Sequence, residues 1–206
     1  MEIKIYEEII LGGANKLSDA LRLEPSIVTE KLIPDNRGWF TELFNEQKFS
    51  ESTGLNIHFI QDNMSFTRAD FGRGLHFQKG EYAQTKLVRL IQGDILDYAV
   101  NIDPNSKDFG KIHEFHLSTK FCDRPDEIKW VLIPKGYAHG FLALENSVVQ
   151  YKVDAPWVKE SERCINMLDT IKPGKYYQFS TKDANAPTFG ETFGEWAESE
   201  KRIRVK

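Results

Sequence analysis

The chain has 206 residues, 40% of them hydrophobic, a length typical of one medium-sized domain with a sizeable core. It carries 27 Lys and Arg against 31 Asp and Glu, and the resulting net charge of -4 argues against nucleic acids and anionic membranes as partners. No apolar run approaches the roughly 20 residues of a transmembrane helix, and the first residues show no secretion signal. We therefore expect a cytoplasmic protein. The cysteines, Cys122 and Cys164, form no CxxC motif, so neither a disulfide scaffold nor a zinc finger is indicated.

Two short helices are predicted near the start of the chain. In residues 15–23 the apolar side chains recur at helical spacing, and residues 41–49 form a second helical segment that Gly54 would end. From residue 23 to residue 151, short segments rich in Val, Ile, Leu, Phe and Tyr alternate with Gly, Asn, Asp and Pro. This pattern is typical of an antiparallel sandwich or barrel. The fold class is therefore mainly β.

Three turns are expected within the β region. The first two would join strands as β-hairpins, and the third would end a strand at Ile102. The three turns are Gly93-Asp94, Glu145-Asn146 and Asp103-Pro104-Asn105.

Beyond residue 153 the chain is more polar and is interrupted by proline, so it is interpreted as a helical or irregular cap. We expect a single domain, 1–206, made of an N-terminal extension (1–22), a β-barrel (23–153) and a C-terminal cap (154–206).

The densest group of polar side chains surrounds His76. Under strict alternation His76 and Gln78 share a strand face with Gly74, and the glycine would leave room for a ligand above that face. Arg73 would point the other way unless a β-bulge turns it inward. A histidine hydrogen-bonded in the sheet interior is the alternative interpretation. The nearby cation, amide and glycines favour a functional site.

Three more polar side chains alternate with apolar ones and are predicted to face the barrel interior: His139, Lys86 and Tyr151. A lysine on an apolar face is costly unless it is paired or used. Tyr151 is equally compatible with a core tyrosine whose hydroxyl is satisfied.

A bound metal is not expected. Gln78 stands where a second imidazole would share the face of His76, and glutamine is a poor ligand for transition metals. His113 and His116 are an odd number of residues apart, so on a strand they would point to opposite faces.

Six segments, taken together and in order, resemble the dTDP-4-dehydrorhamnose 3,5-epimerase family. The segments are residues 35–40, 59–63, 73–78, 84–89, 93–100 and 133–141. The resemblance implies a cupin-type double-stranded β-helix, or jelly-roll barrel, with short flanking helices. It also implies a homodimer, without metal or cofactor, that acts on nucleotide-linked 4-keto-6-deoxy sugars in polysaccharide biosynthesis.

The resemblance also implies roles for individual residues. His76 would be the base that removes a proton beside the ketone, hydrogen-bonded to Asp183. Lys86 would stabilise the enolate, with His139 nearby, and Tyr151 would return a proton to the opposite face. Trp157 would stack on the base of the nucleotide. The other substrate contacts, some of them from the partner subunit, would be Arg37, Glu42, Gln61, Asn63, Arg73, Glu162 and Lys182.

Four alternatives remain open at this stage. A single-centre 3- or 5-epimerase would use the same site, and a sugar 3,4-ketoisomerase would need another acid and base. A non-catalytic sugar-nucleotide binder would bind without proton exchange. A metal-dependent dioxygenase or isomerase would contain a stoichiometric metal.

Overall fold

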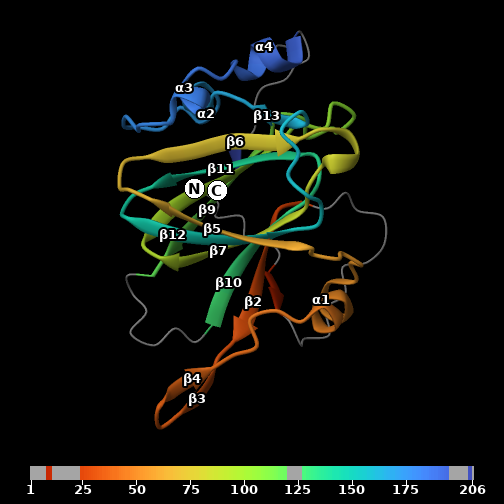
Figure 1. The fold of residues 1–206 in the computed structure, drawn as a ribbon, viewed down its shortest axis with the longest axis vertical. Helices are drawn as coiled ribbons and strands as arrows, with labels where there is room; N and C mark the ends of the chain where they lie inside the picture. Colours follow the sequence, from red (N-terminus) through yellow and green to blue (C-terminus); the bar gives the residue numbers. More distant parts are fainter. Residues whose placement is uncertain (1–7, 11–23, 120–126, 195–203, 206) are drawn as a thin grey trace.

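The structure is a computed structural model that describes residues 8–10, 24–119, 127–194 and 204–205. Two six-stranded sheets pack face to face, and short helices cover their outer sides (Figure 1). The helix predicted at residues 15–23 lies outside the described residues. Within the described ranges, no helix is long and apolar enough to cross a membrane.

The first sheet has the strand order β1-β2-β10-β7-β12-β5, and the second has the order β13-β6-β11-β8-β9-β14. Neighbouring strands are antiparallel except for the pairs β1–β2 and β9–β14. The strands of the first sheet are Glu8–Ile10 (β1), Ser26–Lys31 (β2), Glu127–Ile133 (β10), Lys86–Gln92 (β7), Ser147–Val153 (β12) and Gln61–Thr67 (β5). Those of the second are Glu162–Cys164 (β13), Gly72–Gln78 (β6), Tyr137–Ala143 (β11), Asp94–Asn101 (β8), Ile112–Ser118 (β9) and Arg204–Val205 (β14).

The core has three layers, set by the two sheets. Between the sheets, Val88 and Val131 of the first pack with Phe141 of the second. The outer face of the second sheet packs beneath α2 (Met167–Ile171), α3 (Thr181–Ala184) and α4 (Phe189–Phe193). The outer face of the first sheet packs against α1 (Glu46–Thr53). Because the inner faces are mostly apolar, the polar side chains that remain there stand out as site candidates.

Both predicted hairpins are wrong. The strands on either side of Gly93, β7 and β8, belong to different sheets, and so do β11 and β12 on either side of residues 145–146. Gly93 has a φ of 108°, and a Cβ there would lie 2.7 Å from the Cα of Ser147, so the two crossings pack against each other. Each turn therefore carries the chain across the sandwich. The alternation of apolar residues is the same for either connection, so it does not distinguish them.

The predicted turn after β8 is confirmed, because the amide of Ser106 donates to the carbonyl of Asp103 at 2.9 Å. The second predicted helix begins later than expected, at Glu46, since the side chain of Asn45 caps it by accepting from the amide of Lys48 at 3.1 Å. It ends at Gly54, whose φ is 72°, as the glycine predicted.

Candidate active site

A β-bulge in β6 places Arg73 and His76 on the same inner face. In the ladder with β11, His76 is opposite His139 and Arg73 is opposite Phe141, so β6 has one residue more than its partner. A Cβ on Gly74 would lie 2.6 Å from the carbonyl oxygen of His139. The expectation that this glycine makes room for a ligand is therefore wrong, because the backbone of β11 fills the space.

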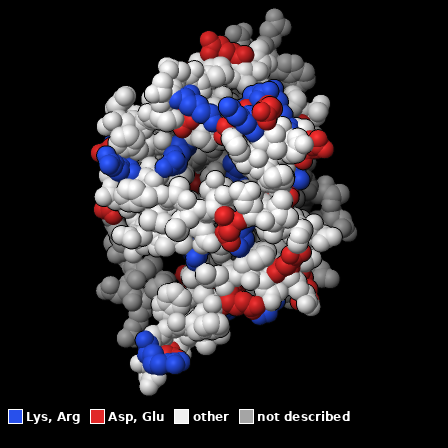
Figure 2. All heavy atoms as spheres, viewed as in Figure 1, with Lys and Arg blue, Asp and Glu red and all other residues white. Residues whose placement is uncertain are grey.

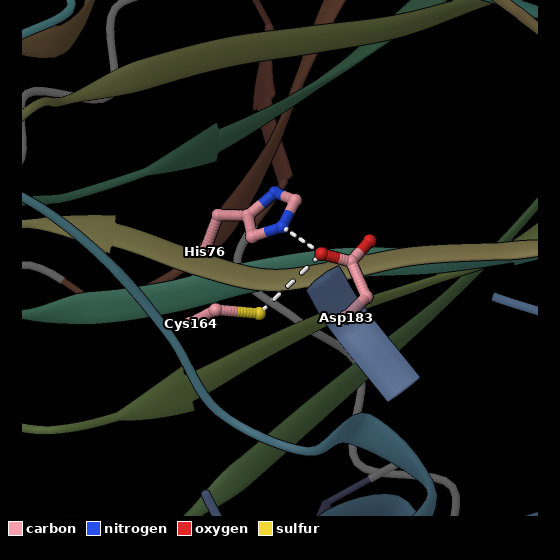
Figure 3. Close-up of side chains that lie close together, drawn as sticks. All are labelled: His76, Cys164 and Asp183. Atoms are coloured by element: carbon pink, nitrogen blue, oxygen red, sulfur yellow. Dashed lines mark hydrogen bonds and ion pairs between the residues drawn. The ribbon is translucent and has the colours of Figure 1, made fainter. Parts of the chain in front are cut away.

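His76 is held by Asp183, which comes from α3 and lies far along the chain. The imidazole Nε2 is 2.7 Å from Asp183 Oδ1 (Figure 3). The Gly74 amide donates to Asp183 Oδ2 at 3.4 Å. Burial alone would raise the pKa of Asp183, but the hydrogen bonds from His76, Gly74 and Cys164 hold it below the ordinary value. An ionised carboxylate only accepts, so the imidazole proton lies on Nε2 and the lone pair on Nδ1.

Cys164 is a third member of this group that sequence reasoning missed. It lies on β13 directly opposite His76 of β6, and its thiol donates to Asp183 Oδ1 at 3.5 Å. Burial, together with the charge of Asp183, raises the pKa of the Cys164 thiol to about 12, so it is neutral. The three residues come from three separate elements, so no local sequence pattern predicts that they meet.

Lys86 and Tyr151 face the interior from the opposite sheet. Tyr151 is opposite both Val88 of β7 and Asn63 of β5, which places Asn63 on the same face. Burial raises the pKa of Tyr151, so its phenol is neutral. Burial lowers the pKa of Lys86 to about 8, although the charges of Asp97 and Glu162 oppose that shift. Tyr151 can therefore act as a neutral acid, and Lys86 can provide a cation.

His139 forms a second histidine–carboxylate pair, with Asp97 of the neighbouring strand β8. Nε2 of His139 is 2.8 Å from Oδ2 of Asp97, and Asp97 is fully buried. Burial lowers the pKa of His139, although Asp97 opposes the shift. Within the described part of the chain, Asp97 Oδ1 has no hydrogen-bond partner. The alternation of Asp97 with Ile95 and Ala99 was the available signal for a polar interior residue, and no role was assigned to it.

The rim carries Glu162, Lys182 and Trp157. Glu162 forms an ion pair with Lys182, and the Trp157 side chain lies close enough to lower the pKa of Glu162. Burial opposes these contacts, but they hold the pKa of Glu162 below its ordinary value. Gln78 fastens the segment that carries Trp157, because its amide donates to the Pro156 carbonyl at 2.8 Å and accepts from the Val158 amide at 2.6 Å. Gln78, which stands where a second metal-binding histidine would be expected, therefore positions the rim.

Gln61 and Asn63 lie two residues apart on edge strand β5, and their side chains hydrogen-bond to each other at 2.8 Å. Arg73 reaches across the sandwich to the same strand, where it donates to Thr67 Oγ1 at 2.7 Å and to the Phe66 carbonyl at 2.8 Å. These three predicted binding residues therefore belong to one wall of the site.

Arg37 and Glu42 are not brought to this site within the chain. Arg37 lies in the turn of a separate hairpin made of β3 (Ile33–Asp35) and β4 (Gly38–Phe40), where it pairs with Asp35 at 2.6 Å. Figure 1 shows this hairpin projecting at the end of the molecule opposite β6. Glu42, which follows it, forms an ion pair with Lys48 of α1.

A cavity of about 350 Å³ adjoins the polar group, and Lys86, Gln78 and Tyr137 are among its lining residues. His76 and Tyr151 are not among the residues that line it. In the view of Figure 2, Lys and Arg side chains gather at the level of β6, around a hollow in the surface. A basic rim of this kind suits an anionic ligand, although the chain as a whole is acidic.

The family model for dTDP-4-dehydrorhamnose 3,5-epimerase matches residues 17–191 of the chain. The chain belongs to this family. The epimerase of that name from Escherichia coli (strain K12) is 43% identical over 148 residues, which cover 71% of this chain and 74% of that protein. The resemblance stated from the six sequence segments is thereby confirmed.

Two solved structures of family members show the same fold. The epimerase from Bacillus anthracis str. Ames, with TDP and PPi bound, has a TM-score of 0.72 at 34% identity and covers 81% of this chain and 94% of its own. The epimerase from Legionella pneumophila Philadelphia 1, in complex with dTDP-4-keto-L-rhamnose, has a TM-score of 0.73 at 32% identity, with coverages of 88% and 94%. The predicted cupin-type jelly roll with short flanking helices is confirmed.

Proposed function

We propose that this protein inverts C3, C5 or both in a nucleotide-linked 4-keto-6-deoxy sugar of the dTDP-4-dehydro-6-deoxyglucose type, through enolate intermediates, in sugar and polysaccharide biosynthesis. The observation that carries the proposal is His76 on one sheet, paired with Asp183 of α3 and facing Lys86 and Tyr151 on the other sheet. A proton beside a ketone is removed from one face and returned to the other. Two opposed walls with a base on one and an acid on the other suit that chemistry.

His76 is proposed as the base. With its proton on Nε2 and Asp183 ionised, Nδ1 accepts the carbon-bound proton, and the carboxylate stabilises the imidazolium that forms. Lys86 supplies its ammonium to the developing enolate oxygen, with His139 as a neighbouring polar group. Tyr151, neutral because burial raises its pKa, donates a proton to the opposite face. No step uses a metal or a cofactor.

The remaining residues are proposed to hold the nucleotide diphosphate. Arg73 has the planar, paired donors that suit a diphosphate, and Lys182 and Glu162 lie on the rim near Trp157. Trp157 keeps its side chain about half exposed, which leaves a face for stacking on the base of the nucleotide. Gln61 and Asn63 provide amide contacts from β5.

We further propose that the chain is a single domain and functions as a homodimer. Strands β1, β13 and β14 come from outside the predicted barrel, 23–153, and join its sheets, which supports one cooperative unit. Arg37 and Glu42 resemble the family's binding residues but lie away from the site of their own chain, so a partner subunit would deliver them.

The decisive experiment is proton NMR with a 4-keto dTDP-sugar in deuterated water. We expect deuterium to replace the C3 and C5 protons, and the His76→Asn variant to abolish the exchange. His58→Asn is the matched control, because His58 is exposed and pairs with Glu46 outside the site. Exchange at one carbon would make the protein a single-centre epimerase, and a 3-keto product would make it a ketoisomerase. Thermal stabilisation by the sugar nucleotide without exchange would identify a binder and contradict the proposal.

Mixing two inactive variants tests the shared site. In a symmetric dimer whose sites combine both chains, a heterodimer of Arg37→Ala with His76→Asn contains one intact site. Random reassociation should then restore about a quarter of the wild-type activity. Light scattering checks that dimers are present. No recovery on mixing, with dimers present, would place Arg37 outside the partner's site.

A further inference from the structure

His76, Cys164 and Asp183 bring three kinds of metal-binding atom together. The imidazole nitrogen, the thiol sulfur and a carboxylate oxygen all lie within 4.8 Å of one another (Figure 3). The sulfur is 3.5 Å and the nitrogen 2.7 Å from the same oxygen, Asp183 Oδ1. The three side chains converge from β6, β13 and α3, so only the folded chain creates this group.

The spacing suits a tetrahedral zinc ion. Zinc bonds of about 2.3 Å to sulfur and about 2.0–2.2 Å to nitrogen and oxygen place ligand atoms about 3.4–3.6 Å apart. The sulfur–oxygen distance already has this value, and the nitrogen–oxygen pair needs to open by less than about 1 Å. The sulfur and the nitrogen lie within 4.8 Å of each other, so this pair needs to close by at most about 1.4 Å. Three protein ligands leave a fourth position for water, as in zinc sites of the open type.

The surroundings favour a cation and fix the ligands. His76 and Cys164 are opposite each other in the β6–β13 ladder, which holds their side chains on one face. The Gly74 amide anchors the second oxygen of Asp183 at 3.4 Å. Glu162 precedes Cys164 by two residues, and its negative charge acts on both His76 and Cys164, although its ion-pair partner Lys182 opposes that charge at Cys164. Ligands supported in this way lose little freedom when a metal binds.

We infer that His76, Cys164 and Asp183 form a binding site for Zn²⁺ and that occupation of this site inhibits the enzyme. The ion replaces the proton on Nε2 of His76, and the neutral ring then carries its proton on Nδ1. Cys164 binds as the thiolate and releases its proton to solvent, so one proton leaves the protein for each ion bound. With Nδ1 protonated, His76 has no lone pair for the substrate. This inhibitory consequence rests on the proposed function, whereas the binding itself does not.

Binding is tested with Co²⁺ as a spectroscopic probe on the untagged full-length protein. Wild type should develop a thiolate-to-cobalt charge-transfer band that Zn²⁺ removes by competition. Cys164→Ser and Cys164→Ala should lack the band, since both remove the thiolate. Cys122→Ser is the matched control because it removes the other cysteine of the chain, and it should keep the band. Melting curves establish that each variant is folded.

Inhibition is measured by deuterium exchange with and without Zn²⁺, relative to the metal-free rate of each variant. We expect a chelator to reverse the inhibition in wild type, and Cys164→Ser to need at least about tenfold more Zn²⁺ for the same effect. A band that persists in both Cys164 variants, or that disappears in Cys122→Ser, overturns the site. A Cys164-dependent band with full exchange activity at saturating Zn²⁺ overturns the inhibition. A Cys164-dependent band in a protein with no exchange at all upholds the site and refutes the proposed epimerase.

Discussion

Burial sets the charge of Lys86, which faces the site from the sheet opposite His76. Its pKa lies at about 8, below the ordinary value, because desolvation outweighs the attraction of Asp97 and Glu162. The ammonium is therefore present below pH 8 and lost as the pH rises through it. A role in stabilising an enolate requires the charged form.

We accordingly expect the rate of proton exchange to fall as the pH rises through about 8. Lys86→Arg should be slower but keep its remaining activity well above that pH, since guanidinium stays protonated. Lys86→Met should lose about 10²–10⁴-fold in rate at all pH values, the range typical of removing an electrostatic or acid–base contribution. If the exchange rate of the arginine variant also fell near pH 8, the fall would belong to a group other than Lys86.

Asp97 couples His139 to Lys86. It accepts from Nε2 of His139 at 2.8 Å, and its charge raises the pKa of Lys86. Asp97→Asn preserves the size of the side chain and removes the charge. The pKa of Lys86 should then decrease further, so the alkaline limb of the exchange rate should move to lower pH. Asp70→Asn, which alters an exposed ion pair with Lys175, is the control and should leave the pH profile unchanged.

At the level of elements, the bulge in β6 decides which side chains enter the site. It needs close approach of two backbones, because Gly74 has a φ of 102° and a Cβ there would lie 2.7 Å from the Cα of Gly140. The sequence prediction named a bulge as the condition for Arg73 to point inward, and the register with β11 shows that bulge. Alternation along a strand predicts the wrong face beyond a bulge, because the extra residue shifts the pattern by one. The orientation of Arg73 therefore follows from the observed strand pairing and not from the alternation.

Gly74→Ala should therefore destabilise the protein by about 1–3 kcal/mol, the cost of a strained backbone and an overpacked contact. Urea unfolding followed by tryptophan fluorescence measures the change, and deuterium exchange should decline as Arg73 and His76 move apart. Gly174→Ala is the control, since nothing lies within 4 Å of its added methyl group. If Gly74→Ala and wild type were equally stable, the prediction would be wrong, because the backbone of β11 would then accommodate the added methyl group without loss of stability.

At the level of the whole molecule, His113 links acidity to stability. It lies in the interior beside Tyr137, at 5.8 Å between ring centroids, whereas His116 is exposed and pairs with Asp94. The predicted opposite orientation of these two histidines is confirmed. Burial lowers the pKa of His113 to about 4, with a further decrease from Lys111. The unfolded chain binds this proton near pH 6.5, so the native state loses stability as the pH falls from about 6.5 to about 4.

The loss should reach about 3 kcal/mol from this one group, and His113→Phe should remove it. Glu30 acts in the opposite direction over part of the range, because burial and the charge of Glu42 raise its pKa to about 7. The relevant measurement is therefore the difference between wild type and variant in unfolding free energy at pH 7 and pH 4.5. Parallel pH dependences of the two proteins would contradict the prediction.

The sequence by itself determined the β class, the turn after β8, the cap at Gly54 and the inward orientation of His139 and Tyr151, because these follow from local propensity and alternation. The six motifs also identified the family. Only the tertiary structure decided that the chain crosses between sheets at Gly93, that Asp183 contacts His76 over a separation of 107 residues, and that Cys164 joins them. It also separated Arg37 and Glu42 from the site of their own chain. These features depend on which strands become neighbours. Pairing between strands is non-local, and the same alternating pattern is compatible with several pairings.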